Sequence, residues 1–187
     1  MCEENPKHSK VAGILLAAGS SLRMGNEDKL LLELKGKPVI EYSLDVLTGL
    51  DMVDVLVIVS PKERQSQIKK LLINTKETIF VEGGERRQDS VAAGLAAVPD
   101  AGWYIIHDGA RPFCSSNLID RVLDATQRYD AAIPVLPINE TVRRITVEKT
   151  NVVARKGLYS VQTPQGFRPE LIYRASSKAQ EKNIEVT

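Results

Sequence analysis

Cysteine is nearly absent from this chain of 187 residues, which contains only Cys2 and Cys114. Two cysteines are too few for a disulfide framework, and neither is flanked by residues that would complete a metal site. No apolar run approaches the roughly 20 residues that span a bilayer, and the first ten residues lack a signal-peptide core. We therefore expect free thiols, no membrane partner and a cytoplasmic location.

An excess of charge of one sign is also missing, because 25 basic and 24 acidic residues give a net charge of +1 at pH 7. Such a chain has no global positive field to recruit nucleic acid, so nucleic acid is not expected as a partner. An anionic ligand must be held by local groups of cations. With 43% hydrophobic residues, residues 1–187 are expected to form a single domain with a sizeable core.

The two commonest nucleotide-binding motifs are missing from the segment that most suggests a phosphate loop, Val11–Lys29. Five residues separate Gly19 from Gly25 and no Lys-Ser or Lys-Thr pair follows, and G-x-G-x-x-G is absent. What is present is an apolar run, Val11–Leu16, typical of a buried parallel strand, followed by small residues and two cations. Small residues let backbone N–H groups approach an anion. The pattern favours a phosphate loop over an ordinary loop with solvated cations; its residues are Ala17, Ala18, Gly19, Arg23 and Lys29.

Strand-like and helix-like segments alternate along the first three quarters of the chain. This alternation predicts an α/β fold: a Rossmann-like, mainly parallel sheet with helices on both faces. Ligands of such sheets bind at the carboxyl ends of the strands. After the first strand, the expected strands are Asp54–Ser60, Thr78–Val81, Trp103–His107 and Ala131–Leu136; the expected helices begin at Pro38 and span Pro61–Leu72, Asp89–Val98 and Ser115–Arg128.

From Pro137 to Ser160 the pattern changes to short polar–apolar alternation, with a turn expected at Lys149–Asn151. This segment predicts a β-hairpin arm that projects from the core, and it is too small to be a second domain.

Three loops are expected at the carboxyl ends of strands: Ala18–Lys29, Glu82–Ser90 and Asp108–Pro112. A cation-rich edge with one carboxylate, Asp108, suits a nucleoside triphosphate with Mg²⁺, which prefers one or two carboxylates plus phosphate oxygens. The alternative is an ion pair between Asp108 and Arg111 that merely stabilises the loop. The neighbouring His107 is expected to be a buried strand residue rather than a catalytic imidazole. The cations that the three loops supply are Arg23, Lys29, Arg86, Arg87 and Arg111.

Five motifs occur in order: LLAAGSSLRMG, EGGERRQDSVAAGL, IHDGARPF, ETVRR and ARKGLYSVQTPQGF. Together they make the chain resemble the 2-C-methyl-D-erythritol 4-phosphate cytidylyltransferases of non-mevalonate isoprenoid biosynthesis, from Val11 to Thr187. The resemblance implies a nucleotidyltransferase fold and transfer of CMP from CTP to methylerythritol phosphate, with release of pyrophosphate. The ribitol-5-phosphate cytidylyltransferases share most of these residues. Cytidylyl transfer to ribitol 5-phosphate or another sugar phosphate, and a non-catalytic nucleotide-binding relative, therefore remain alternatives.

The resemblance also implies roles for individual residues. Arg23 and Lys29 match the catalytic cations, and Asp108 matches a carboxylate that binds substrate and Mg²⁺ or another divalent cation. Thr141 and Arg155 match arm residues, within 137–160, that one subunit of a homodimer lends to the other. The implied nucleotide-binding residues are Ala17, Ala18, Gly19, Gly84, Glu85, Arg87 and Ser90, and the implied substrate-binding residues are Asp108, Arg111, Thr141 and Arg155.

The chain departs from the family pattern in two places. The family commonly has Pro-Lys-Gln at the second catalytic cation, whereas Lys29 here lies between Asp28 and Leu30. The chain stops at Thr187, where the sequence looks like the start of the family's Thr-Asp-x-Ala motif. The family's final portion carries a further metal-binding Asp and a Lys near the phosphates, so we expect the C-terminal part of the family domain to be missing.

Overall fold

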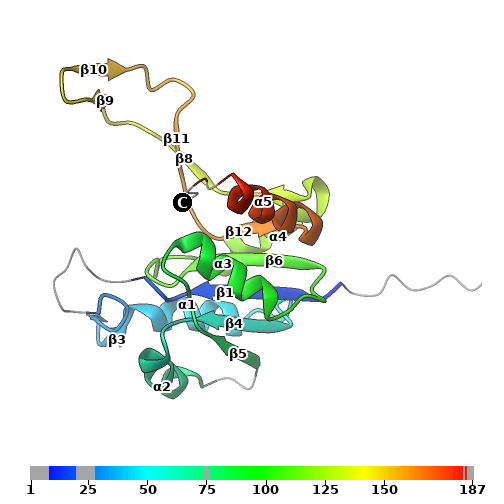
Figure 1. Ribbon diagram of the computed structural model, residues 1–187. Coiled ribbons are helices and arrows are strands. Elements are labelled where there is room, and N and C mark those ends of the chain that lie inside the picture. Colours follow the sequence, from blue (N-terminus) through cyan, green and yellow to red (C-terminus); the bar gives the residue numbers. More distant parts are fainter. Residues whose placement is uncertain (1–8, 20–27, 74–75, 183, 185–187) are drawn as a thin grey trace, which may run out of the picture.

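A six-stranded sheet forms the centre of the computed structural model, which describes residues 9–19, 28–73, 76–182 and 184 (Figure 1). Its strands are β1 (Val11–Leu16), β4 (Val55–Val59), β5 (Glu77–Val81), β6 (Trp103–Asp108), β7 (Ala131–Ala132) and β12 (Gln165–Phe167). They lie in the order β5-β4-β1-β6-β12-β7. The first four pair in parallel, and β12 pairs antiparallel with β6 and β7. The predicted mainly parallel sheet is confirmed, with an antiparallel edge that the sequence patterns did not indicate.

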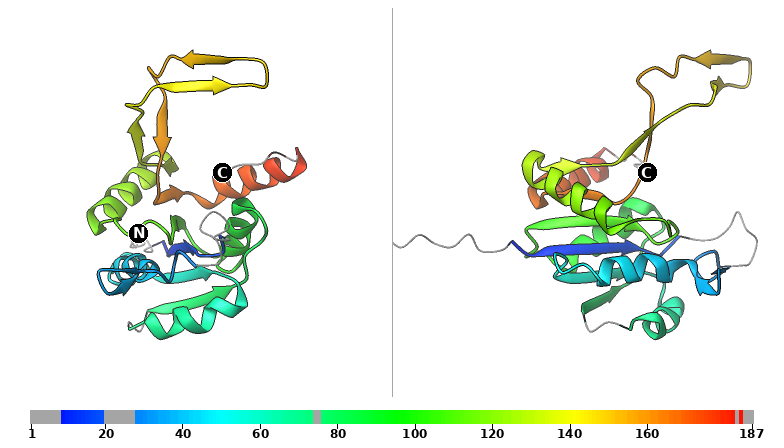
Figure 2. Two further views of the ribbon diagram at one scale, coloured as in Figure 1. Left: turned by 90° about the vertical axis from the view of Figure 1, so that its left-hand side faces the viewer. Right: turned by 180° about the vertical axis from the view of Figure 1, so that it is seen from behind.

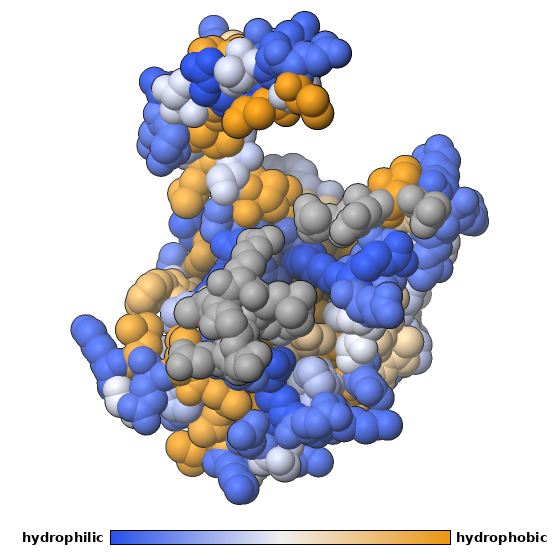
Figure 3. All heavy atoms as spheres, turned by 60° about the vertical axis from the view of Figure 1, so that its left-hand side comes forward, coloured by the Kyte–Doolittle hydropathy of each residue, from blue (hydrophilic) through white to orange (hydrophobic). Residues whose placement is uncertain are grey.

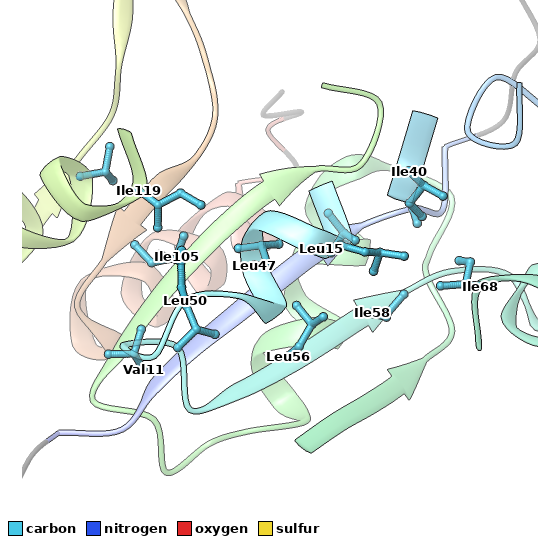
Figure 4. Packing of buried hydrophobic residues seen from close by; sticks show 14 of the residues in the cluster. Val11, Leu15, Ile40, Leu47, Leu50, Leu56, Ile58, Ile68, Ile105 and Ile119 are labelled. Carbon is cyan, nitrogen blue, oxygen red and sulfur yellow. The ribbon is translucent and has the colours of Figure 1, made fainter. Parts of the chain in front are cut away.

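Helices cover both faces of this sheet, which explains why its central strands are continuously apolar. On one face, α1 (Val39–Thr48), α2 (Lys62–Leu71) and α4 (Ser116–Tyr129) contribute to a core built on Leu15 and Leu56 (Figure 4). On the other face, α3 (Arg87–Ala96) and α5 (Pro169–Glu181) pack on Ile14 and Val57. Successive residues of a strand point to opposite faces, so β1 contributes to both cores.

The helix boundaries follow the sequence closely. Gly49 is the C-cap of α1, and the hydroxyl of Ser115 caps α4 by accepting a hydrogen bond from the Leu118 N–H at 3.3 Å. Pro38, expected as the first helical residue, instead precedes α1 and ends a small hairpin of β2 (Glu33–Leu34) and β3 (Lys37–Pro38). The predicted strand Ala131–Leu136 is also wrong, because it divides into β7 and a separate strand, β8 (Val135–Pro137).

An arm projects from the sheet between β8 and the end of β11 (Tyr159–Val161) (Figure 2). It consists of two antiparallel pairs: β8 with β11, and β9 (Val142–Ile145) with β10 (Thr150–Val153). The turn lies at residues 146–149 rather than at Lys149–Asn151, because Thr150 and Asn151 pair with β9. Hydrophobic side chains remain exposed along the arm, including Leu136, Ile145, Val147, Val152 and Tyr159. Figure 3 shows hydrophobic atoms, in orange, on the surface of the arm. Across the described ranges, no helix has the length and apolar character needed to cross a membrane.

Candidate active site

A cleft of about 820 Å³ lies at the carboxyl edge of the parallel strands. Three loops meet there, as predicted: those after β1, after β5 and after β6. The lining contains four cationic side chains and two carboxylates, which makes the cleft suitable for a polyanion. The predicted site residues in the lining are Ala18, Gly19, Lys29, Gly84, Glu85, Arg87, Ser90, Asp108 and Arg111.

Three of the predicted site residues that the structure describes, Ala17, Thr141 and Arg155, are not part of this lining. Ala17 is buried between the lining residues Leu16 and Ala18, with 1% of its surface exposed. Arg23 lies outside the described residues. Thr141 and Arg155 are exposed on the arm, where the Arg155 guanidinium donates a hydrogen bond to the Asn139 carbonyl. A single copy of the chain therefore does not bring the two arm residues into the cleft.

Some lining residues were not predicted. They are Leu16, Leu30 and Ala110, which adjoin predicted residues along the chain. Their side chains are apolar and carry no chemical signal, so only the folded geometry identifies them.

Asp108, the last residue of β6, is held by arginines from two directions. Arg87 of α3 donates to its Oδ1 atom from Nε at 3.2 Å and from Nη2 at 3.1 Å. Arg111 donates to Oδ2 from Nε at 3.1 Å. The ion pair considered as an alternative is therefore present. It does not exclude ligand binding, because a carboxylate has about four acceptor positions and these contacts use three.

Close packing of small residues forms the wall between two of the loops. A Cβ atom on Gly83 would lie 2.3 Å from the Ala18 Cβ and 2.8 Å from the Ser90 Oγ. A larger residue at position 83 would therefore push the phosphate loop away from α3. Ser90 itself is buried, and its hydroxyl donates to the Gly84 carbonyl at 3.4 Å.

The start of α3 is fixed by Asp89, whose carboxylate accepts hydrogen bonds from both the backbone N–H and the guanidinium of Arg86. The guanidinium lowers the pKa of Asp89. A negatively charged side chain in the first turn stabilises the N-terminus of a helix. Gly84 and Glu85, which connect β5 to this fixed helix start, therefore line the cleft in a defined position.

His107 is 1% exposed and takes part in a chain of hydrogen bonds that ends on the lining residues Asp108 and Arg111. The Asp108 N–H donates to the Thr163 Oγ1 at 3.3 Å, and Thr163 Oγ1 lies 2.9 Å from His107 Nδ1. His107 Nε2 lies 3.2 Å from the Arg111 carbonyl. The chain is consistent with a neutral ring that accepts at Nδ1 and donates at Nε2. Burial lowers the pKa of His107, which favours this neutral form. The expectation of a buried, hydrogen-bonded histidine is confirmed.

Within the ranges that the structure describes, no three His, Cys, Asp or Glu side chains gather as a self-contained metal site. The cleft lining offers two carboxylates, Glu85 and Asp108, that could hold a metal together with phosphate oxygens of a ligand.

Comparison with known proteins decides the family. The sequence model described as 2-C-methyl-D-erythritol 4-phosphate cytidylyltransferase matches residues 11–187. The chain belongs to the 2-C-methyl-D-erythritol 4-phosphate cytidylyltransferase family. It is thus a nucleotidyltransferase that transfers CMP from CTP to 2-C-methyl-D-erythritol 4-phosphate in isoprenoid biosynthesis.

Individual members of the cytidylyltransferase family show how far the likeness extends. The 2-C-methyl-D-erythritol 4-phosphate cytidylyltransferase of Dehalococcoides mccartyi (strain 195) is 39% identical over 175 residues, which cover 90% of this chain and 76% of the relative. The Clostridium novyi enzyme is 36% identical, with coverage of 96% and 80%. Among solved structures, 4-diphosphocytidyl-2C-methyl-D-erythritol synthase from Anaerococcus prevotii has a TM-score of 0.84 at 29% identity, with coverage of 97% and 81%. The Thermus thermophilus cytidylyltransferase has a TM-score of 0.75 at 32% identity, with coverage of 95% and 80%.

Proposed function

We propose that the cleft at the carboxyl edge of the sheet is where this cytidylyltransferase binds CTP and transfers CMP. One observation carries the proposal: three loops that are distant in sequence contribute nine predicted site residues to a single cation-rich cleft. Because the family reaction joins two anionic substrates, a site of this charge at a strand edge is the expected solution.

The chemistry needs positioning more than it needs acid–base catalysis. The nucleophile is a phosphate oxygen that is already ionised at neutral pH, so no general base is required. The difficulty is to hold two anions in line and to stabilise the charge that develops at the α-phosphorus. Lys29, together with Arg23, contributes charge-assisted hydrogen bonds to the triphosphate, each worth roughly 1.5–3 kcal/mol.

Asp108 is the residue that would hold Mg²⁺, together with phosphate oxygens of the substrate. The chemistry that such an ion would supply there is neutralisation of phosphate charge. Arg87 and Arg111 fix the carboxylate through the contacts described above, so its orientation is set before substrate arrives.

The loop after β5 is suited to the cytosine and ribose of CTP. Gly84 and Glu85 offer backbone groups at the cleft wall, and Ser90 offers a hydroxyl beside them. A site built on hydrogen bonds rejects analogues that leave buried polar groups unpaired. We therefore assign CTP preference over ATP and GTP to this wall.

The acceptor substrate is bound by Asp108 and Arg111 and, in a homodimer, by Thr141 and Arg155 of the twofold-related copy. Asp108, as an ionised carboxylate, can accept hydrogen bonds only from hydroxyl groups of the acceptor, so the phosphate is assigned to the arginines. An exposed two-stranded ribbon is marginally stable by itself, and the arm exposes Ile145, at 77%, and other apolar side chains. Packing of the arm on a second copy would bury these side chains and complete the site.

Release of pyrophosphate tests the proposal, with CTP, Mg²⁺ and methylerythritol phosphate as substrates. We expect release that depends on all three, and that falls at least ~10²-fold in Lys29→Ala, as for loss of one transition-state charge contact. Lys10→Ala is the matched control, because Lys10 lies at the opposite end of β1, where it pairs with Asp100. Faster release with ribitol 5-phosphate would support the alternative acceptor. Unchanged turnover in Lys29→Ala would show that Lys29 is not part of the catalytic site.

A further inference from the structure

Arg64, in the first turn of α2, contacts both ends of the phosphate loop although it does not line the cleft. Its Nε donates to the Asp28 Oδ2 at 2.5 Å, and its Nη1 donates to the Ala17 carbonyl. The side chain of Arg64 is only 12% exposed, and that of Asp28 is 27% exposed. The guanidinium of Arg64 therefore joins Ala17, at the start of the loop, to Asp28, near its end.

At the far end, Asp28 organises the turn that carries Lys29. Its second carboxylate oxygen, Oδ1, accepts a hydrogen bond from the Leu30 N–H at 3.1 Å. Its backbone carbonyl accepts from the N–H groups of Leu31 at 2.9 Å and of Leu32 at 3.2 Å. The position of Lys29 thus depends on Asp28, and one carboxylate oxygen of Asp28 depends on Arg64.

At the near end, Ala17 is tied to the sheet and to Arg64 together. Its N–H donates to the Val59 carbonyl of β4 at 2.8 Å, while its own carbonyl accepts from Arg64. The next two residues, Ala18 and Gly19, line the cleft. The residues proposed to face the triphosphate, Ala18, Gly19 and Lys29, therefore lie one or two positions away from the residues that Arg64 holds.

We propose that Arg64 is a positioning residue for cytidylyl transfer, and that it acts through Ala17 and Asp28. It sets the separation between the backbone of Ala18 and Gly19 and the ammonium group of Lys29 before CTP binds. Misplacement of a reacting group by about 1 Å can cost ~10²-fold in rate, so loss of this link affects catalysis without removing any group from the cleft. This inference rests on the proposed role of Lys29.

The test compares variants of the link with a control from the same helix. Arg64→Gln and Asp28→Asn are each expected to lower kcat/KM for CTP at least ~10-fold, with the KM of the acceptor and the unfolding temperature little changed. Arg64→Lys should be intermediate, because an ammonium group lacks the fork that reaches two acceptors at once. The double variant should be no worse than the poorer single variant, because Arg64→Gln already removes the ion pair that Asp28→Asn would break. Lys62→Gln is the control: Lys62 is 75% exposed and pairs with Glu82.

Two results would overturn the inference. Wild-type kcat/KM for CTP in Arg64→Gln, with Lys29→Ala impaired, would reject the positioning role and leave the site assignment standing. A lower unfolding temperature of Arg64→Gln with unchanged kinetics would show that Arg64 only anchors α2 to the rest of the fold. If Lys29→Ala also retained wild-type kinetics, the proposed site would fail instead. Should Arg64→Gln not fold, Arg64→Lys and Asp28→Asn decide by the same kinetic criteria.

Discussion

Arg87 donates two hydrogen bonds to one oxygen of Asp108, from Nε at 3.2 Å and from Nη2 at 3.1 Å. This contact links the first turn of α3 to the end of β6, and both residues line the cleft. Arg111 holds the other oxygen from the loop that follows. The orientation of the carboxylate is thereby fixed by two elements that also line the cleft.

Asp108→Asn is expected to lower turnover by about 10- to 100-fold, because it removes the negative charge proposed to hold Mg²⁺. Charge-assisted contacts of this kind are worth roughly 1.5–3 kcal/mol. The unfolding temperature should change little, since partly exposed ion pairs contribute little to stability. The measurement is the rate of pyrophosphate release against Mg²⁺ concentration. Asp100→Asn, at the opposite end of the sheet, is the control for loss of an ion-paired carboxylate. An unfolded Asp108→Asn protein, together with a wild type that needs no divalent cation, would favour a purely structural ion pair.

Gly83→Ala is expected to destabilise the fold by about 1–3 kcal/mol, as overpacking typically does, and to raise the KM for CTP. The added Cβ would lie 2.3 Å from that of Ala18. Adding Ala18→Gly removes that clash, so the double variant should recover part of the lost stability. Urea unfolding of the three variants measures the effect. A double variant whose stability loss equals the sum of the two single losses would show that the two residues do not press on one another.

The stability of the protein should depend on pH through His107. Burial lowers its pKa in the folded state, whereas in the unfolded chain the ring protonates below a pH of about 6.5. The unfolded state then binds more protons than the folded state. The free energy of unfolding is therefore at its full value above about pH 6.5 and decreases as the pH falls from there toward the folded-state pKa.

His107→Gln keeps a donor for the Arg111 carbonyl but cannot titrate. Urea unfolding at pH 7.5 and at pH 5.5 should show a larger loss of stability on acidification in the wild type than in this variant. Equal losses in both proteins would mean that His107 does not titrate differently on unfolding.

The arm can be tested by mixing two inactive proteins. An Arg155→Ala subunit should impair the cleft of its partner, and a Lys29→Ala subunit should impair its own. After the two are refolded together in equal amounts, random twofold pairing should restore about a quarter of all sites. Pyrophosphate release before and after mixing is the measurement. No recovery despite demonstrated subunit exchange would place Arg155 in its own subunit's site or in none.

Most of the fold could be predicted because its sequence signals are local. Apolar runs such as Val55–Val59 are buried on both faces, so their composition alone identifies them as central strands. The antiparallel strand β12 has only three residues, one of them Gly166, and its pairing depends on β6 and β7. A short strand that owes its existence to distant partners carries no periodic signal.

The candidate site could be predicted to the level of its loops but not of its contacts. The small residues and cations near Gly19 and Gly84 indicate a polyanion site wherever they occur at strand ends. The Arg64 link was not predicted, because a surface helix is expected to carry basic residues, and its contacts to Ala17 and Asp28 span 47 and 36 positions. Only the fold brings those atoms together.

A crystal structure with a non-hydrolysable CTP analogue and Mg²⁺ tests the central claim most directly. We predict the triphosphate against Ala18, Gly19 and Lys29, the cytosine beside Gly84 and Ser90, and the metal on Asp108. An analogue bound elsewhere, for example in the apolar pocket that Val91, Phe167 and Ile172 line between α3 and α5, would contradict the assignment of the cleft as the site of cytidylyl transfer.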